Sequence, residues 1–373
     1  MDGFFDKYGR VIIIAVAICF VLLYLTPMRN VVGSSINGFA GNFANKVGES
    51  LGTVKMPDGS NNIKREPSSM LMRSYPSNYI GYPSSFYKEV PESATKIMFT
   101  DEKAPKGVST TDLTTAKDGD VVGWLDGTTW KVSTQDSKKS ITFNTDSSFM
   151  FEDCKNIKEI QFNNINTSQV VNMSSMFNRC SNLTSLDLSN FDTSKVEDMK
   201  YMFAYCSNLT NLEISHFDTS NVTDMDDMFS GCESLKELDL SGFDTSNVDT
   251  MVCMFKNCKQ LKEFNINNWN VSKVKNMASM FNTCKSLTTL NLGNWKTSNL
   301  FHTYGMFYEC KNLEKLDLSH FDTSQIGNPK GNMDEMFYWC INLKSIKARS
   351  QTDIDNFKTK NTWIEGNTKF EIA

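Results

Sequence analysis

One five-residue pattern, Met-Phe-x-x-Cys, recurs eight times in this chain and constrains its fold more than any other feature. Its first six intervals are 26 residues long, and the last is 30 because four residues are inserted around positions 328–331. So regular a period indicates stacked supersecondary units instead of the two or three ordinary domains that 373 residues would suggest. The eight patterns begin at Met150, Met176, Met202, Met228, Met254, Met280, Met306 and Met336.

Each unit reads MFxxCxxLxxLxLSxFDTSxVxxMxx, most clearly in the copy that begins at Met202. Leu212 and Ile214 alternate with polar residues, which predicts a short strand with one side facing inward. The Asp-Thr-Ser phrase that begins at Asp218 predicts a turn capped by its own side chains. The apolar residues that follow recur at helical spacing and predict a short helix: Val222, Met225, Met228, Phe229 and Cys232.

One such unit buries too little apolar surface to offset the entropy of ordering its chain, so neighbouring units must stack. The predicted fold class is therefore an α/β solenoid of coils, each made of a short strand and a short helix. A small β-rich cap should precede the array, with Asp126-Gly127 as a hairpin turn. Its strands are expected at residues 96–100, 121–125, 129–133 and 140–143.

An unbroken apolar run, VIIIAVAICFVLLYL, lies near the N-terminus and predicts a single-pass membrane segment. We favour an uncleaved signal anchor because no small-x-small cleavage pattern closes the run, although a cleaved signal peptide remains the alternative. Lys7 and Arg10 precede the run and Arg29 alone follows it closely, which predicts a cytoplasmic N-terminus and an extracellular remainder. Beyond it, Ala40, Ala44 and Gly48 form a small-residue ridge that would permit self-association of this helix, or reflects only local composition.

These patterns predict seven parts, and we expect the aromatic residues of the linker, among them Phe86, to pack against the first coil. The parts are a cytoplasmic N-terminus (1–10), a transmembrane signal anchor (11–28), a helical extension (29–52), a Pro-rich, Ser-rich and Tyr-rich linker (53–94), a β-rich N-terminal cap (95–149), the eight repeats (150–350) and a C-terminal cap (351–373).

The repeated MFxxCxxLxxLDLSxFDTSxVxxM resembles the bacterial surface protein 26-residue repeat, the BspA-like branch of leucine-rich repeats, over about residues 95–350. The preceding DGDVVGWLDGTTWKVS also resembles the start of that family. The resemblance implies surface display and, in some members, attachment to host or matrix components. Two repeats depart from the pattern, since Trp269 and Trp295 replace the Phe of the FDTS phrase.

Several classes of function are disfavoured. The formal net charge of −5 comes without a basic cluster, so nucleic acid is not an expected partner. The chain has no HExxH, GxSxG, GxGxxG or phosphate-loop pattern, so we expect no catalytic residue and no cofactor. The one Cys per repeat predicts a buried apolar column more strongly than a metal site or disulfides. The recurring Asp of FDTS predicts turn capping more strongly than a calcium ladder.

The outward strand positions form an acidic, amide-rich stripe that is the candidate ligand-binding surface, for a protein or a glycan. A solvated face with no ligand is an equally good reading. We expect a membrane-anchored adhesion or binding protein; the alternatives are a pilin-like, self-assembling subunit with the solenoid as cargo, and an envelope-spacing protein. The stripe comprises Glu159, Gln161, Asp187, Glu213, Glu237, Asp239, Glu263, Asn265, Asn291 and Asp317.

Overall fold

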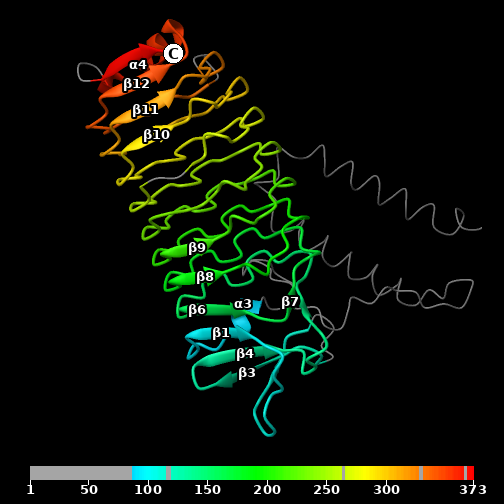
Figure 1. The fold of residues 1–373 in the computed structure, drawn as a ribbon. Coiled ribbons are helices and arrows are strands. Elements are labelled where there is room, and N and C mark those ends of the chain that lie inside the picture. The colour runs from blue at the N-terminus through cyan, green and yellow to red at the C-terminus, as the bar shows by residue number, and fades with distance from the viewer. Residues whose placement is uncertain (1–85, 115–118, 263–264, 327–330, 365–367) are drawn as a thin grey trace, which may run out of the picture. The chain divides into compact units, whose positions relative to one another are not determined.

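The structure is a computed structural model that describes residues 86–114, 119–262, 265–326, 331–364 and 368–373. All of these residues belong to one compact unit of the chain. Within this unit the chain winds as a solenoid, whose coils stack one upon the next from the N-terminal cap to the C-terminal cap (Figure 1). The predicted solenoid is therefore present.

The N-terminal cap is a five-stranded sheet in the order β2-β3-β4-β1-β6. The antiparallel hairpin of β3 and β4 turns at Gly127, whose φ of 59° is the left-handed conformation that glycine adopts readily. Strand β1 runs parallel to both β4 and β6, and β6 belongs to the first coil of the array. The strands are β1 (Lys96–Phe99), β2 (Thr111–Asp112), β3 (Val122–Asp126), β4 (Thr129–Ser133) and β6 (Glu159–Phe162).

The short helix α3 (Phe86–Glu89) packs against this cap. Phe86 is fully buried, and its ring lies 5.3 Å from the rings of both Trp130 and Phe151, measured between centroids. The prediction that Phe86 packs on the start of the solenoid is confirmed. Residues 86–94, which the sequence assigned to the linker, are thus part of the folded unit, because Phe86 is buried against the cap and the first coil.

Strands recur at one position in the coils and pair in parallel. Leu186 pairs with Leu212, and Leu290 pairs with Leu316, so the inward leucines are in register from coil to coil. A second small sheet joins β5 to β7 on another side. The strands are β5 (Ile141–Thr142), β7 (Ile165–Asn166), β8 (Ser185–Asp187), β9 (Asn211–Glu213), β10 (Thr289–Asn291), β11 (Lys315–Leu318) and β12 (Ser345–Ala348).

The predicted short helix in each coil is wrong. The Met-Phe segment is a run of overlapping turns, in which Tyr201 and Tyr205 have φ values of 57° and 58°. The amide of Phe203 donates to the carbonyl of Met228 in the next coil at 2.9 Å, whereas that of Met202 donates back to Met199 at 3.1 Å. Because alternate amides bond across coils, they are not free for the i−4 bonds of an α-helix. The fold class is therefore a solenoid of strand-and-turn coils.

The core consists of columns of identical side chains, one from each coil. In the longest aromatic column, Phe203 stacks on Phe229 at 5.7 Å and Phe229 on Phe255 at 5.6 Å, with ring planes within 6° of parallel. Trp269 and Trp295, which replace Phe in the FDTS phrase, stack on each other at 6.2 Å in a parallel column. The departures from the repeat consensus therefore preserve the core.

The C-terminal cap combines helix α4 (Gln351–Lys360), the 3₁₀ turn η2 (Thr362–Ile364) and strand β13 (Lys369–Ile372). Strand β13 pairs in parallel with β12 and extends the four-stranded sheet β10-β11-β12-β13. Helix α4 buries Phe357, whose ring meets that of Phe337 edge-on at 5.6 Å. The sequence predicted a cap here but not this helix.

No helix in the ranges that the structure describes is long and apolar enough to cross a membrane. Residues 1–85 lie outside the described residues. The predicted cytoplasmic N-terminus, signal anchor, helical extension and most of the linker fall there, and they stay predictions.

Candidate recognition surface

The strands of the solenoid present two outward rows of side chains, which together we call the strand face. The alternation is plain in β8 and β9, where the central leucine is buried and its two neighbours are exposed. Because strands of a sheet lie about 4.8 Å apart, each row repeats at that spacing from coil to coil. The first row holds Lys96, Glu159, Ser185, Asn211, Glu237, Thr289, Lys315, Ser345 and Lys369; the second holds Met98, Gln161, Asp187, Glu213, Asp239, Asn265, Asn291, Asp317, Lys347 and Glu371.

The structure brings the predicted stripe residues together on this face. Asp187 lies directly opposite Glu213, and Asn291 directly opposite Asp317. Gln161, Asp239 and Asn265 occupy the same row, while Glu159 and Glu237 occupy the other. Glu263 lies outside the described residues. Apart from Glu263, each predicted residue is exposed or half-buried, as a surface open to a ligand requires.

The acidic residues of the strand face also cap the turns that follow the strands. Asp187 accepts the amide of Ser189 at 2.9 Å, and Asp239 accepts that of Ser241 at 3.0 Å. Backbone and side-chain hydrogen bonds from Ser189 lower the pKa of Asp187 below its ordinary value, and bonds from Ser241 do the same for Asp239. These carboxylates are therefore ionised at neutral pH, and each has a structural task besides any contact with a ligand.

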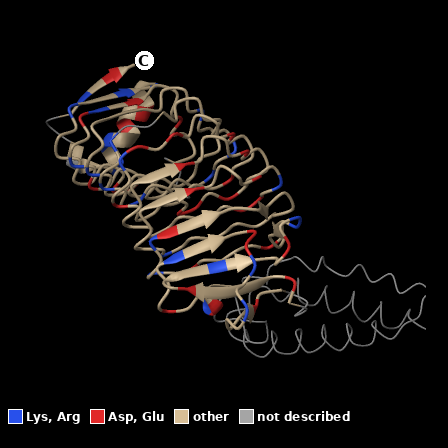
Figure 2. Cartoon of the chain, turned by 60° about the horizontal axis from the view of Figure 1, so that its bottom comes forward, with Lys and Arg blue, Asp and Glu red and all other residues tan. Residues whose placement is uncertain are grey.

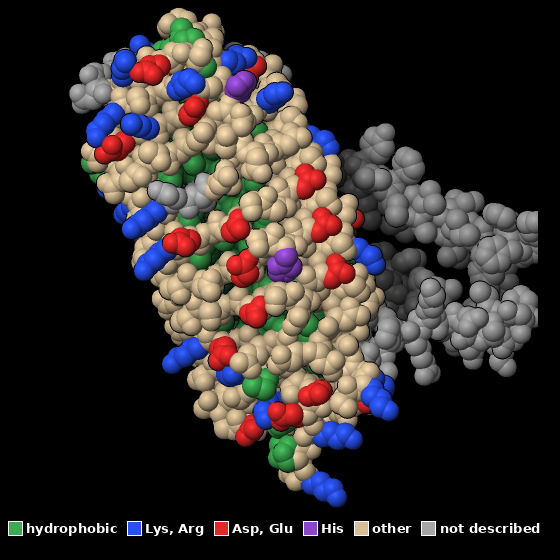
Figure 3. Space-filling view, in the orientation of Figure 1, with side chains coloured by type: hydrophobic (Ala, Val, Ile, Leu, Met, Phe, Trp, Pro, Cys, Tyr) green, Lys and Arg blue, Asp and Glu red, His purple; other side chains and the backbone are tan. Residues whose placement is uncertain are grey.

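The charge of the strand face changes along the solenoid, and lysines lie beside the acidic, amide-rich stripe toward its C-terminal end. The middle coils carry Asp187, Glu213 and Asp239, whereas the C-terminal coils add Lys315 and Lys347. Figure 3 shows acidic side chains across the middle coils and Lys or Arg more often toward both ends. Figure 2 shows both charges mixed along the ribbon at the C-terminal end. The sequence prediction selected only acids and amides and missed these lysines.

A hollow of about 260 Å³ interrupts the strand face near the C-terminal end. Its walls come from the outward residues of β10, β11, β12 and β13, including Asn291 and Asp317 of the predicted stripe, and from Leu290 and Leu316 between them. The alternation of outward and inward residues continues in the last coil, at Ser345 and Lys347. That alternation was the sequence signal that could have identified the other wall residues.

The Asp-Thr-Ser phrase works as predicted, through turn capping. Asp192 accepts hydrogen bonds from the amide of Ser194 at 3.0 Å and from its hydroxyl at 2.6 Å. Asp218 accepts the same two bonds from Ser220. The buried Thr of the phrase has a second task that joins neighbouring coils, since the hydroxyl of Thr193 donates to the carbonyl of Asp218 at 3.0 Å. The phrase is thus a structural ladder.

The cysteine column is also structural, as predicted. The thiol of Cys206 donates to the carbonyl of Phe177 at 3.1 Å, and that of Cys232 to Phe203 at 3.2 Å. Burial raises the pKa of the Cys206 thiol to about 12, so the reactive thiolate is suppressed. All nine cysteines of the described residues are free, and these residues contain no cluster of three or more His, Cys, Asp or Glu side chains arranged to hold a metal ion.

The fold and the strand face define a class, that of solenoid repeat proteins with one polar sheet face. The family model described as "Mycoplasma protein of unknown function, DUF285" matches residues 145–264, 186–287 and 254–372. These overlapping matches cover the repeats and the C-terminal cap, more than half of the chain. The chain therefore belongs to the DUF285 family.

Comparisons with solved structures and with curated proteins say less about this chain than the family match does. The crystal structure of a leucine-rich cell surface protein from Faecalibacterium prausnitzii A2-165 is similar over 72% of this chain and 90% of that chain. The identity is 13% and the TM-score is 0.23, which is too low to carry an argument about this protein. Among curated proteins none matches the chain.

Proposed function

We propose that this protein is displayed at the cell surface, held by residues 11–28, and recognises a positively charged protein segment through the middle of its strand face. The observation that carries the proposal is the row of carboxylates at Asp187, Glu213 and Asp239, exposed on three successive coils. Their spacing of about 4.8 Å suits an extended or helical segment that bears several Lys or Arg side chains. Surface display is supported by the apolar run near the N-terminus and by the resemblance to the bacterial surface repeat.

A second argument supports recognition over a merely solvated face. Extended solenoid faces bind partners because each coil contributes the same positions to one continuous surface. Like charges directly opposite one another in a sheet are destabilising, and Asp187 lies opposite Glu213. A row that served solubility alone would be better built with alternating charges, whereas a basic partner relieves the repulsion.

The test removes charge without removing the turn caps. In purified full chain, Asp187→Asn, Glu213→Gln and Asp239→Asn are combined, since an amide oxygen still accepts the bond from the serine two residues later. The matched control, Asp192→Asn with Asp218→Asn and Asp244→Asn, removes three charges from the FDTS turns, outside the strand face. Asn stands at that place naturally in Asn270, where it accepts the amide of Ser272.

Binding of a fluorescent oligolysine peptide is measured by anisotropy at low and high ionic strength. The strand-face variant should bind at least about threefold more weakly than the control variant, because the losses of three weak, exposed charge pairs add together. Salt should weaken binding by the unmodified chain. Equal binding by the two variants would contradict the proposal.

The pilin-like alternative assigns self-assembly to the N-terminal helix. The two functions make different demands on the strand face. If residues 11–52 drive self-assembly, neither oligolysine binding nor the strand-face substitutions should change the assembly state.

A further inference from the structure

The hollow near the C-terminal end of the strand face differs in chemistry from the acidic middle. Lys315 and Lys347 both line it, on the adjacent strands β11 and β12. Lys315 lies between two short side chains, with Thr289 opposite it on one neighbouring strand and Ser345 opposite it on the other. These small neighbours leave the space that makes the hollow.

The acids beside these lysines have closer partners than the lysines themselves. Lys347 lies opposite Asp317, but Asp317 Oδ1 accepts both the amide of Ser319, at 3.0 Å, and the hydroxyl of the same residue. On the other side of Lys347, Glu371 forms its ion pair with Lys369 at 2.8 Å. Within the ranges that the structure describes, neither Lys315 nor Lys347 has an ion pair within 4.0 Å. Two ammonium groups at one hollow are thus left without a counter-charge in direct contact.

The other two lysines of the two outward rows are neutralised. Lys96 pairs with Glu159 at 3.1 Å, and Lys369 pairs with Glu371 at 2.8 Å. The contrast sets the hollow apart as the place on this face where an anionic group would meet two available cations.

The rest of the lining offers hydroxyl and amide groups. Thr289 and Ser345 each provide a hydroxyl that can donate or accept, and Asn291, whose Oδ1 accepts the amide of Gly293, retains an NH₂ donor. Asp317 Oδ2 can accept from a ligand hydroxyl. The volume of about 260 Å³ is below the roughly 300–1,000 Å³ of sites for drug-sized ligands, so one ring and its charged group fit better than a larger body.

We infer that this hollow binds a carboxylated sugar ring at the end or branch of a glycan. Its carboxylate lies between the ammonium groups of Lys315 and Lys347, and its hydroxyls bond to Asn291, Asp317 and Ser345. A peptide with acidic side chains is the competing ligand, since Leu290 and Leu316 also line the hollow. The hydroxyl and amide groups around the two lysines favour the sugar, because its own hydroxyls can bond to them. The inference rests on the proposed function only in assigning recognition to the strand face. It concerns the C-terminal end of that face, away from the acidic middle coils.

Binding is measured by saturation-transfer NMR on the purified full chain with matched probes. Two pairs distinguish the possible sources of the acidic ring: 3′-sialyllactose against lactose, and glucuronate against glucose. An oligoglutamate peptide tests the competing class of ligand. Lys315→Ala combined with Lys347→Ala is compared with Lys236→Ala, which removes an exposed lysine from the margin of the strand face, outside the hollow.

At least one acidic probe should bind while its neutral partner does not, and the double variant should lose about tenfold or more in affinity, with Lys236→Ala unchanged. Equal signals from acidic and neutral sugars, no signal from either pair, or lysine-dependent binding of the peptide in place of the sugars would each overturn the inference. Substitution of Asp187, Glu213 and Asp239 leaves the hollow intact. Loss of oligolysine binding and loss of sugar binding therefore report separately on the proposed function and on this inference.

Discussion

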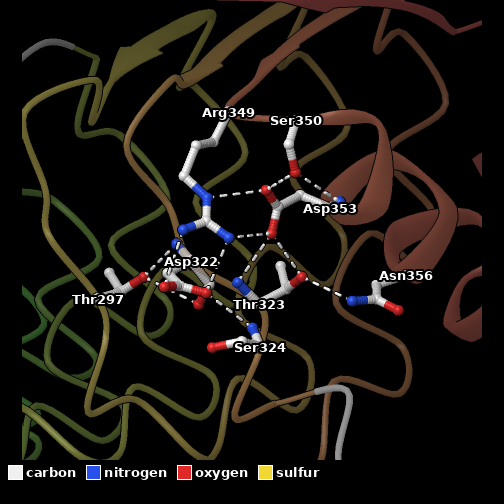
Figure 4. Close-up of polar contacts among 8 residues, drawn as sticks. All are labelled: Thr297, Asp322, Thr323, Ser324, Arg349, Ser350, Asp353 and Asn356. Atoms are coloured by element: carbon white, nitrogen blue, oxygen red, sulfur yellow. Dashed lines mark hydrogen bonds and ion pairs between the residues drawn. The ribbon is translucent and has the colours of Figure 1, made fainter.

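Thr323 donates its hydroxyl to Asp353 Oδ1 at 2.7 Å and its amide to the same oxygen at 3.0 Å (Figure 4). In an earlier coil, the equivalent hydroxyl of Thr297 donates to the main-chain carbonyl of Asp322, one coil further on. The last repeat has no FDTS turn to supply the next carbonyl, and the carboxylate of Asp353 supplies the acceptor instead. Arg349 bonds to Asp353 through Nε at 2.9 Å and also pairs with Asp322, so the substitute acceptor is held in place.

Loss of the Asp353 carboxylate should loosen the last coil. Asp353→Ala leaves the fully buried Thr323 hydroxyl and amide without this acceptor and is expected to lower the free energy of unfolding by about 2–3 kcal/mol. Urea unfolding measures the loss, and hydrogen exchange at the Thr323 amide should accelerate. Asp355→Ala on the exposed side of α4 is the control, and an equal effect of the two substitutions would contradict the capping role.

The raised pKa of Asp198 should make the free energy of unfolding depend on pH. Burial raises its pKa above the ordinary value, and the neighbouring carboxylate of Asp224 adds to the rise. The folded state therefore binds a proton at this carboxyl group more tightly than the unfolded state does. The stability that the protonated carboxyl group contributes is fully present below the unfolded pKa of about 3.9 and is lost as pH rises through the folded pKa. Asp198→Asn removes that loss and keeps the acceptor for the amide of Lys200.

The Asp198→Asn variant should accordingly be more stable than the unmodified chain at neutral pH. The gap between the two free energies of unfolding should widen as pH rises from about 4 to 7. The sequence offers a precedent, because Asn172 and Asn276 occupy the same ladder of bridges and accept the amides of Ser174 and Ala278. A gap that stays constant across this pH range would show that Asp198 does not titrate as its burial requires.

The cysteine column should resist alkylation in the folded protein. Cys206 and Cys284 are fully buried, and burial raises the pKa of each thiol to about 12. Cys253 lies outside the column and is half-buried, with a pKa raised to about 11, again chiefly by burial. Among the nine described cysteines, iodoacetamide labelling followed by mass spectrometry should therefore modify Cys253 first and the column only after urea is added. Rapid native labelling of Cys206 would contradict the structure.

The aromatic column should carry a large share of the stability. Phe229→Ala removes a fully buried ring that stacks between Phe203 and Phe255, and should cost about 3–5 kcal/mol in the free energy of unfolding. Tyr205→Ala, at a side chain that is 46% exposed, should cost less than about 1 kcal/mol. Urea unfolding followed by circular dichroism compares the two. Similar costs would show that the stacked column is not the main source of stability.

The period of the repeat was enough to predict the solenoid, the inward leucines and the structural roles of FDTS and Cys206. It was not enough to predict the conformation of the Met-Phe segment. Met199, Met202 and Cys206 have a spacing that suits a helix, but it suits successive three-residue turns equally well. What decides between them is the bond from Phe203 to Met228 in the next coil, which no local pattern records.

The candidate site was predicted in outline for a similar reason. Strand alternation identified Asp187, Glu213 and Asp239 as outward residues, and the structure exposes all three and pairs Asp187 with Glu213. The hollow depends on which short side chains flank Lys315 across two neighbouring strands, which only the register reveals. Asp353 was missed because it lies in the cap, outside the repeat, and its partner Thr323 is 30 residues away.

Protease shaving of intact cells tests the central claim most directly, since recognition outside the cell requires that the solenoid be exposed there. Cells that express the full chain are treated with protease, and antibodies against the solenoid are used on the released material and on the membrane fraction. We predict that the solenoid is released while a short N-terminal piece that contains residues 11–28 stays with the membrane. A solenoid that remains intact until the cells are lysed would contradict surface display and would place its partner inside the cell.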